Sequence, residues 1–458
     1  MTSGTHRWIR VEVPIETLDP WTLLPPLQQD GARLMAWSAP SKNVTFVAVG
    51  DLIECRPTGV SRFDEARTWW EPIANDMITV DETGTPVENQ TPACVAGFAF
   101  QNDRNRSKEW VAWGDGALCV PETMVWSTGD NAVAVFTIDS HEHDVSQHLL
   151  KLRAQLDDWV TRAHPQNRSV ANGHVKEHGA VDGAWEAWRS RVESAQSTMA
   201  NGALRKVVLA RSQAFTPGDA NSFDPLATAW ALRQRQTNST TFLIRKKDGQ
   251  AFLGSSPETL VQLSDHLVTT VALAGTRKRG ESSTEEDEAL GAALLDSEKD
   301  RHEQELVAEA IVEALRPYVH DLQQTADPEI VRHPDVQHLR TEIQGSLANN
   351  ATIFELVKQL HPTPAVGGLP RESALAWLDD HEHLDRGWYA GPIGWLSPKG
   401  EGEFVVAIRS VLMTGHMASA FAGCGLVLSS NPADEWEESQ VKLQTVRQGL
   451  AFQQSADR

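Results

Sequence analysis

The chain has 458 residues, of which 40% are hydrophobic and 22% charged, proportions that are ordinary for a globular protein of one to three domains. Its formal net charge of −21 argues against a nucleic-acid-binding protein, which needs a basic face, and offers no attraction to anionic lipid. The first residues lack the apolar core of a secretory signal, and no stretch approaches the ~20 apolar residues of a membrane span. We therefore expect a cytoplasmic protein that binds no membrane, with its four cysteines reduced because none shows a CxxC spacing.

Residues 1–145 predict a part of the fold that is rich in β-strands. Two strand-like runs at 122–127 and 132–138 flank a Gly-Asp-Asn turn and predict a hairpin. A helix is expected next, because apolar side chains recur at helical spacing over residues 149–159. The polar segment 163–182 contains His-Pro, Asn-Gly and His-Gly pairs and is the best candidate for a linker.

The rest of the chain combines strands and helices without a regular order. Residues 185–199 predict a helix, with Asp182 as a possible cap. A second helix carries Glu303, and the last helix begins at Pro432 with Asn431 as its cap. Strand-like runs occur at residues 206–211, 241–245, 251–255, 258–263, 267–274, 404–412 and 418–422. Strands from both halves, with helices between them and no regular βαβ alternation, indicate the α+β class.

Carboxylates stand on two separate predicted helices at positions where a charge is costly. Glu303, together with His302, continues the apolar stripe of its helix, where an unpaired carboxylate would be strongly destabilising. Glu435, Glu438 and Lys442 lie at i, i+3 and i+7 and therefore share one helical face. Oxygen ligands without Cys or His spacing favour Mg²⁺ over Zn²⁺. A solvated acidic face remains the alternative for the two later glutamates.

Two further residues could transfer protons. Lys206 opens a buried strand, where desolvation or a neighbouring cation can lower the pKa of a lysine; a lysine that reaches water is the alternative. Glu258 follows a Gly-Ser-Ser-Pro segment, in which glycine and proline let the backbone turn so that the carboxylate could point into a cleft. A glutamate at a hairpin edge is the alternative. On neighbouring strands the lysine and the glutamate would form a usable acid–base pair.

Other segments could bind an anion or could be ordinary structure. Residues 274–280 form a glycine-containing basic loop that could hold an anion through backbone N–H groups or could be a solvated turn. Arg409 stands in an apolar predicted strand, where arginine usually has an anionic partner. The Gly-Cys-Gly segment 423–425 lets a ligand approach the backbone closely. The His-Glu-His runs at 141–143 and 381–383 have no further ligands nearby, so surface or loop histidines are expected there.

A series of ordered motifs covers roughly residues 185–450: KVVLAR (206–211), GSSPE (254–258), AGTRKRG (274–280), SEKDRHE (297–303), HPTPA (361–365), GWYAG (387–391), AIRS (407–410) and EWEESQVK (435–442). These motifs resemble those of the chorismate-utilising enzymes, and most of all the isochorismate synthases of the menaquinone type. The resemblance implies the α+β fold of anthranilate synthase component I, with large antiparallel sheets and outer helices. It also implies a divergent, β-rich N-terminal part at 1–180, a catalytic core at 181–452 and a tail at 453–458.

The resemblance implies a role for each matching position. Lys206 corresponds to the general base that activates water, and Glu258 to the general acid that protonates the leaving hydroxyl. Glu303 and Glu438 match Mg²⁺ ligands, with Glu435 near the metal or its waters. The implied contacts to the substrate are Thr276, His338, Ala365, Tyr389, Arg409, Gly423 and Lys442.

The resemblance further implies an isomerase that converts chorismate to isochorismate with Mg²⁺ and without a redox cofactor. Ala274 stands where aminodeoxychorismate synthases carry a nucleophilic lysine, and ammonia-using anthranilate synthases lack a lysine at the position of Lys206, so water is the expected nucleophile. Salicylate synthases tend to have threonine at the position of Ala365, and alanine favours stopping at isochorismate.

Several alternatives stay open at this point. The chain could be a salicylate synthase that also eliminates pyruvate, could supply a catechol siderophore instead of menaquinone, or could be a non-catalytic chorismate-binding module. A monomer is expected rather than an oligomer.

Overall fold

The computed structural model describes residues 6–88, 91–102, 106–129, 131–163, 170–172, 175–178, 184–218, 222–280, 283–348 and 351–454. Most of the predicted linker at 163–182, including the possible cap Asp182, lies outside these ranges. No helix within them is both long and apolar enough to cross a bilayer.

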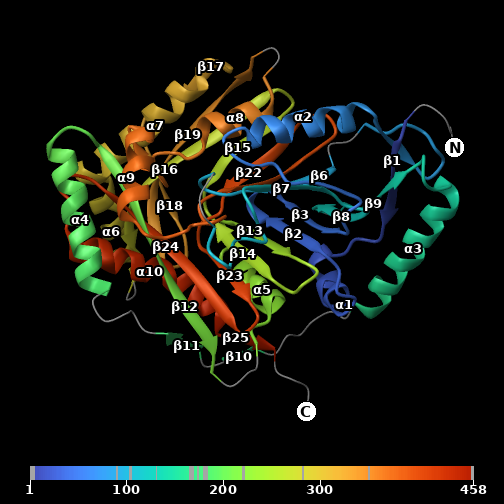
Figure 1. Cartoon of the computed structure of the whole chain (residues 1–458), viewed down its shortest axis with the longest axis horizontal. Helices are drawn as coiled ribbons and strands as arrows, with labels where there is room; N and C mark the ends of the chain where they lie inside the picture. Colours follow the sequence, from blue (N-terminus) through green and yellow to red (C-terminus); the bar gives the residue numbers. More distant parts are fainter. Residues whose placement is uncertain are drawn as a thin grey trace.

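Two large sheets, built mainly from antiparallel pairs, form the centre of the molecule (Figure 1). Strands from before and after residue 180 lie side by side in the larger sheet. Its 13 strands are, in spatial order, β11 (Val175–His178), β12 (Lys206–Pro217), β24 (Met417–Leu426), β23 (Ser410–Thr414), β14 (Ala251–Ser256), β13 (Thr240–Arg245), β2 (Leu34–Ala39), β3 (Val44–Val49), β8 (Thr123–Thr128), β9 (Asn131–Asp139), β1 (Trp8–Ile15) and β5 (Met77–Asp81), with β20 (Gly368–Leu369) beside β12.

The second sheet likewise combines strands from the two halves of the chain. Its ten strands are β17 (Val319–Gln324), β19 (Val336–Leu347), β16 (Leu267–Lys278), β15 (Thr259–Ser264), β22 (Gly402–Val406), β21 (Pro392–Leu396), β6 (Cys94–Phe98), β7 (Gly116–Val120) and β4 (Ile53–Cys55), with β18 (Glu329–Arg332) beside β19. A separate pair joins β10 (Val170–Asn172) to β25 (Phe452–Gln454).

Helices cover the outer faces of both sheets (Figure 1). Against the larger sheet lie α3 (Val145–Arg162), α5 (Pro225–Arg235) and α10 (Pro432–Leu450), with α1 (Leu24–Gln29) beside α3. Against the second lie α6 (Thr284–Leu295), α7 (Glu298–Leu315) and α8 (Ile353–Leu360), with α2 (Arg62–Asn75) packed on α8. At one end, α4 (Ala184–Ala200) packs on α10, and α9 (Arg371–His381) packs on β20. This arrangement confirms the α+β class with large antiparallel sheets and outer helices.

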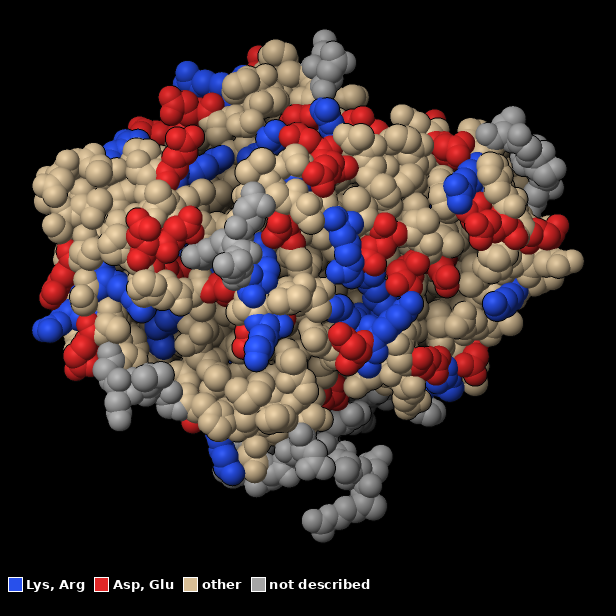
Figure 2. Space-filling model, viewed as in Figure 1, with Lys and Arg blue, Asp and Glu red and all other residues tan. Residues whose placement is uncertain are grey.

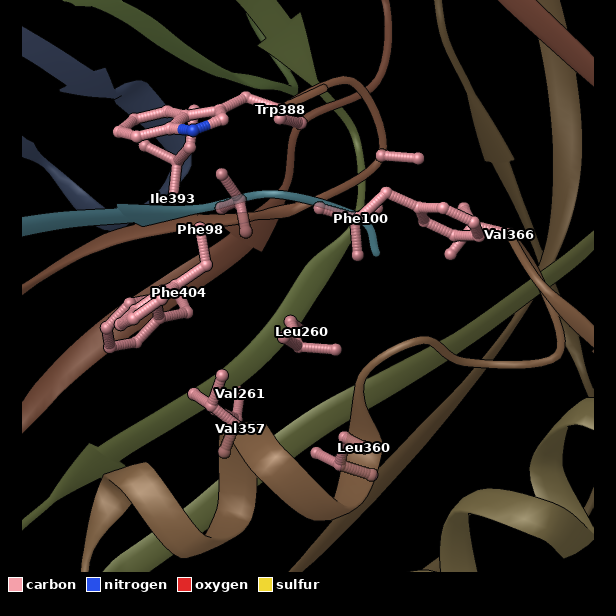
Figure 3. Close-up of a cluster of buried hydrophobic side chains, with 14 of the residues drawn as sticks. Phe98, Phe100, Leu260, Val261, Val357, Leu360, Val366, Trp388, Ile393 and Phe404 are labelled. Atoms are coloured by element: carbon pink, nitrogen blue, oxygen red, sulfur yellow. The ribbon is translucent and has the colours of Figure 1, made fainter. Parts of the chain in front are cut away.

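The inner faces of the two sheets share a core of large apolar side chains. Trp126 of β8 meets Trp395 of β21 with ring centroids 5.6 Å apart. Phe98 and Phe404 lie on the opposite face of the second sheet, where Figure 3 shows them with Leu260 beside Val357 and Leu360 of α8. Each such side chain contributes roughly 1.5–3 kcal/mol when it is fully buried, so these contacts hold the two sheets to each other and α8 to the second sheet.

The chain passes between the sheets at two places that lie next to each other. Strand β14 of the larger sheet ends at Ser256, and β15 of the second sheet begins at Thr259, so Pro257 and Glu258 form the first crossing. The second crossing, residues 407–409, leads from β22 back to β23. The Ser256 hydroxyl donates to the Val406 carbonyl at 2.6 Å, and the Val406 N–H donates to the Glu258 carbonyl at 3.0 Å. The two crossings therefore support each other.

Most predicted elements are confirmed. Strands β8 and β9 pair as the expected hairpin, and the side chain of Asn431 caps α10 with Pro432 in its first turn. The single strand predicted at 404–412 is wrong, because the chain changes sheets there and Arg409 adopts a left-handed φ of 51°. His302 is exposed and does not continue the buried stripe of α7.

Acidic and basic side chains are interspersed over the face of the molecule shown in Figure 2. On that face, the net charge of −21 is therefore not gathered into one acidic patch.

Candidate active site

An open cavity lies where β12 and β24 of the larger sheet approach β16 and β19 of the second, between α7 and α10. The structure brings together at this cavity every position to which the sequence resemblance assigns a role. These lining residues are Lys206, Glu258, Thr276, Glu303, His338, Ala365, Tyr389, Arg409, Gly423, Glu435, Glu438 and Lys442. Their individual roles stay predictions.

Three carboxylates from α7 and α10 each form an ion pair with a lysine. Lys206 Nζ lies 2.8 Å from Glu303 Oε1, Lys299 Nζ lies 3.0 Å from Glu435 Oε1, and Lys442 Nζ lies 2.6 Å from Glu438 Oε1. The two helices thus bring three acids and two of the three lysines to one wall of the cavity, and β12 supplies the third lysine. Acids from two separate helices therefore line the same cavity.

The charges around these acids shift their pKa values in opposite directions. Burial would raise the pKa of Glu303, but the nearby charges of Lys206, Lys299 and Lys442 outweigh burial, and the pKa is lowered. Burial raises the pKa of Glu435, and the neighbouring charge of Glu438 raises it further. Glu435 and Glu438 are adjacent, and their carboxylates repel each other because Glu435 is almost fully buried. A cation between them would relieve that repulsion.

The donor set fits a magnesium ion. The ligand atoms of Glu435, Glu438 and Cys424 lie within 4.8 Å of one another, a spacing that one ion can bridge, although Glu303 is not part of that group. Carboxylate oxygens suit Mg²⁺, whereas the thiol of Cys424 does not, and that thiol already donates to the Glu435 carbonyl. Glu435, Glu438 and Glu303 would therefore hold Mg²⁺ once Lys206 releases the last of them.

Glu258 owes its position to the first crossing between the sheets. Its carboxyl group is buried, and burial raises its pKa to about 7 in spite of the neighbouring Lys206 ammonium. The Thr363 hydroxyl donates to Glu258 Oε1 at 3.4 Å. Lys206 and Glu258 do not stand on neighbouring strands as the sequence suggested, since β24 and β23 separate β12 from β14. They meet because the crossing turns the carboxyl group towards the cavity.

A β-bulge at Gly275 sets Thr276 opposite His338 on the paired strands β16 and β19. His338 Nδ1 lies 3.1 Å from the Gly275 carbonyl, and Arg409 Nη2 donates to His338 Nε2 at 3.3 Å. Because a guanidinium only donates, Nε2 must be the acceptor and Nδ1 carries the proton. Burial lowers the pKa of His338 far below its ordinary value, so the ring is neutral. A neutral histidine thereby orients the buried Arg409.

Arg409 is a buried cation at the cavity wall, and none of the described residues forms an ion pair with it. Sequence reasoning expected an anionic partner for this residue. An arginine that is buried beside a cavity, without a carboxylate of its own, is suited to bind an anionic group of a ligand.

Sequence reasoning missed an ion pair that holds the strand of Lys206. Arg386 and Glu382 are both buried, and Arg386 Nη2 lies 2.6 Å from Glu382 Oε2. Arg386 also donates to the Val208 carbonyl at 2.6 Å, and Glu382 accepts from the Ala210 N–H at 2.8 Å. Strand β20 pairs with β12 only at Lys206 and Val207. Beyond that point, these two side chains supply the hydrogen-bond partners of the Val208 carbonyl and the Ala210 N–H.

Two further residues of the cavity wall, Lys299 and Asp300, were also missed. Lys299 precedes Glu303 by four residues on α7, so helical spacing alone could have placed the two on one face. Glu382 offered no such signal, because it sits within a His-Glu-His run that reads as surface.

Comparisons with known proteins show the family to which this chain belongs. The model of a family described as chorismate binding enzyme matches residues 1–451. The salicylate biosynthesis isochorismate synthase of Pseudomonas aeruginosa is 36% identical over 95% of this chain and 89% of that protein. The isochorismate synthase MenF of Bacillus subtilis is 32% identical over 95% of this chain and 92% of that protein.

Solved structures show the same fold. The menaquinone-specific isochorismate synthase MenF from Escherichia coli superposes with a TM-score of 0.78 at 26% identity, covering 97% of this chain and 95% of the other. Anthranilate synthase component I from Streptococcus pneumoniae superposes with a TM-score of 0.71 at 20% identity over 88% and 92% of the two chains, a likeness of fold alone. The family match spans both sheets and every lining residue of the cavity, and this chain belongs to the chorismate-binding enzymes.

Proposed function

We propose that this chain is a Mg²⁺-dependent isochorismate synthase. The observation that carries the proposal is the pairing, in one cavity, of the buried amine of Lys206 with a buried carboxyl group, Glu258, whose pKa is about 7. A carboxyl group with that pKa is still substantially protonated at neutral pH, as a general acid must be.

The substrate is a dianion, and the cavity offers cations to receive it. Arg409 and Lys442 would bind its carboxylates, with the Tyr389 hydroxyl near Gly423 completing that wall. Lys442 is fixed because it donates to the Gly423 carbonyl at 2.8 Å as well as pairing with Glu438. These local charges would overcome the unfavourable net charge of the chain at close range.

The proposed reaction moves a hydroxyl group around the ring. Lys206 takes a proton from water as the water oxygen forms a bond to C2. The bond between C4 and its hydroxyl breaks, and Glu258 gives its proton to the departing oxygen, so that water leaves. Atoms balance as an isomerisation without a redox cofactor. To act as a base, Lys206 must first lose the proton that pairs it with Glu303.

Glu303, Glu435 and Glu438 would hold Mg²⁺, as the carboxylate cluster on α7 and α10 allows. Bound there, Mg²⁺ would neutralise the ring carboxylate and polarise the conjugated system. Thr276 and His338 would shape the wall opposite, where His338 orients Arg409.

The decisive experiment incubates the protein with chorismate and Mg²⁺ and separates the products. Isochorismate as the sole product supports the proposal. Release of pyruvate, read by a coupled lactate dehydrogenase assay, would make the chain a salicylate synthase; Ala365 favours the first outcome. Anthranilate made from ammonium, or chorismate binding without turnover, would refute the proposal.

We extend the proposal to menaquinone biosynthesis. The relative from Escherichia coli, named menaquinone-specific, supports this pathway, whereas the relative from Pseudomonas aeruginosa is named for salicylate biosynthesis. Deletion of the gene in its host should lower menaquinone. Unchanged menaquinone with lost salicylate or catechol siderophore would assign the enzyme to iron uptake instead.

A further inference from the structure

The three ion pairs at the carboxylate cluster differ in how firmly each lysine is held. The side chain of Lys206 is 1% exposed and that of Lys442 is 16% exposed, and Lys442 has a second acceptor in the Gly423 carbonyl. The side chain of Lys299 is 39% exposed. Among the residues that the structure describes, Glu435 is the one hydrogen-bond acceptor of its ammonium group.

Glu435, in contrast, is nearly buried, and Lys299 is its cationic partner, with a further hydrogen bond from Ser430. Its side chain is only 3% exposed, and Lys299 Nζ lies 3.0 Å from its Oε1 atom. Lys299 reaches this carboxylate from α7, on which Glu303 stands one turn later, so its charge also acts on Glu303. One lysine therefore contributes to neutralising carboxylates from both helices that would hold the metal.

A divalent cation and this ammonium cannot share the same carboxylate. Two positive charges within ~4 Å repel strongly in a partly buried site, and an oxygen that ligates Mg²⁺ has little capacity left for a second cation. Of the three lysines, Lys299 can move into water at the lowest cost, because its side chain is the most exposed of the three and its four-carbon chain is flexible.

We propose that Lys299 is an exchangeable counter-ion of the metal site, which neutralises Glu435 in the metal-free protein and is displaced into solvent when Mg²⁺ binds. The inference rests on the Mg²⁺ site of the proposed function and adds a competitor for that site. It assigns Lys299 no part in proton transfer. Because the two cations compete for Glu435, the ion pair between Lys299 and Glu435 weakens Mg²⁺ binding. By linkage, Mg²⁺ binding must weaken that ion pair to the same degree.

The first test follows the lysine itself. The metal-free protein is treated with an amine-acetylating reagent, with and without 10 mM Mg²⁺ at matched ionic strength, and acetylation of each lysine is measured by mass spectrometry. Acetylation of Lys299 should rise severalfold with Mg²⁺. Lys358 is the internal control, because its side chain has a similar exposure, 41%, and its ion pair with Asp64 lies outside the cavity. Equal acetylation of Lys299 in both conditions overturns the proposal.

The second test follows the metal. Calorimetry should give Lys299→Gln a Kd for Mg²⁺ roughly five- to tenfold lower than that of the unaltered protein, because the competitor is gone. Lys299→Arg retains the charge and should not bind Mg²⁺ more tightly, and Lys358→Gln should leave the Kd unchanged. A Kd for Lys299→Gln that equals or exceeds that of the unaltered protein contradicts the inference.

Neither test requires turnover, so the two proposals fail separately. Absence of isochorismate with normal Mg²⁺ binding would refute the function and leave the counter-ion role standing. Isochorismate formation, with no change in the acetylation of Lys299 on addition of Mg²⁺, would support the function and refute the counter-ion role. If Mg²⁺ fails to bind the protein at all, the counter-ion role falls together with the metal assignment.

Discussion

At the scale of single residues, Lys206 carries the most specific prediction. Lys206→Ala should lower isochorismate formation at least ~100-fold, because the variant lacks the base that we propose to activate water. Its affinity for chorismate in the presence of Mg²⁺ should persist, since Arg409 and Lys442 remain. Product assay and calorimetry together test both expectations. Lys358→Ala, which removes an ion-paired lysine outside the cavity, is the matched control. Near-normal turnover in Lys206→Ala would show that another group is the base.

Glu258 gives a prediction about pH. As a general acid it acts in its protonated form, and its pKa is raised to about 7, so activity should be highest below that value and decline as the pH rises through it. Glu258→Gln cannot donate this proton, and its residual rate should lose the alkaline decline. The measurement is a profile of kcat against pH for both proteins. If kcat of the variant still declines at alkaline pH as in the unaltered protein, a group other than Glu258 causes the decline.

The same carboxyl group has a consequence for stability. Because its pKa in the folded protein exceeds the ordinary value of 4.5, the folded state binds the proton more tightly, and stability falls as the pH rises from about 4.5 to 7. Glu258→Gln should therefore raise the free energy of unfolding at pH 8 by about 3 kcal/mol, with little change at pH 4.5. Urea unfolding at the two pH values measures the difference, and the exposed Glu309→Gln should show none. A less stable Glu258→Gln protein at pH 8 would contradict this account.

At the scale of elements, strand β24 approaches the site so closely that Gly425 leaves no room for a side chain. A Cβ atom there would stand 2.4 Å from Glu303 Oε1 and 3.0 Å from Lys206 Cε. Both contacts are far ends of flexible side chains, so Gly425→Ala should fold but displace the Lys206–Glu303 pair. We expect at least tenfold weaker Mg²⁺ binding with a melting temperature changed by only a few degrees.

Gly423→Ala is the matched control on the same strand. A Cβ atom at Gly423 would meet the Tyr389 hydroxyl and Val208 at 3.2 Å, away from Glu303. Its Mg²⁺ affinity should stay near that of the unaltered protein, measured by calorimetry. Equal losses in the two variants would mean that β24 acts on the site through general strain rather than through Glu303.

The sequence predicts the elements better than it predicts how they meet. Helical periodicity and caps place Glu303 on α7 and Glu435 on α10, because these signals are local to each helix. The residues 407–409 read as part of one strand, since an apolar run does not reveal that the chain changes sheets. Glu382 reads as a surface residue because its contact with the edge of β12 is set by tertiary packing, although its other partner, Arg386, is only four residues away.

For the candidate site too, local patterns identify the residues but not their contacts. The resemblance of short motifs is sufficient to select Lys206, Glu258, Glu303, Glu435 and Glu438, because each lies within a short run with its own pattern. The pairing of each glutamate with its own lysine depends on distances between elements, and only the folded chain supplies these.

At the scale of the whole molecule, every residue assigned to the site comes after residue 180 in the chain. The two sheets that position these residues, however, also contain strands from before residue 180. Strand β13 is paired with β2 from Ser38 to Leu34, and β21 is paired with β6 from Cys94 to Gly97. Removing the N-terminal half would expose both strands as unpaired edges in the middle of their sheets and uncover the shared aromatic core.

A fragment of residues 184–458 should therefore fail to fold on its own, although it holds every residue to which we assign a catalytic or metal-binding role. We expect no cooperative urea transition by far-UV circular dichroism and no Mg²⁺ binding by calorimetry, whereas co-expression with residues 1–178 should restore both if the two pieces re-form the shared sheets. A fragment that unfolds cooperatively and binds Mg²⁺ alone would show that the pairing of β13 with β2 is dispensable. The N-terminal half would then serve the catalytic core as a cover and not as part of its two sheets.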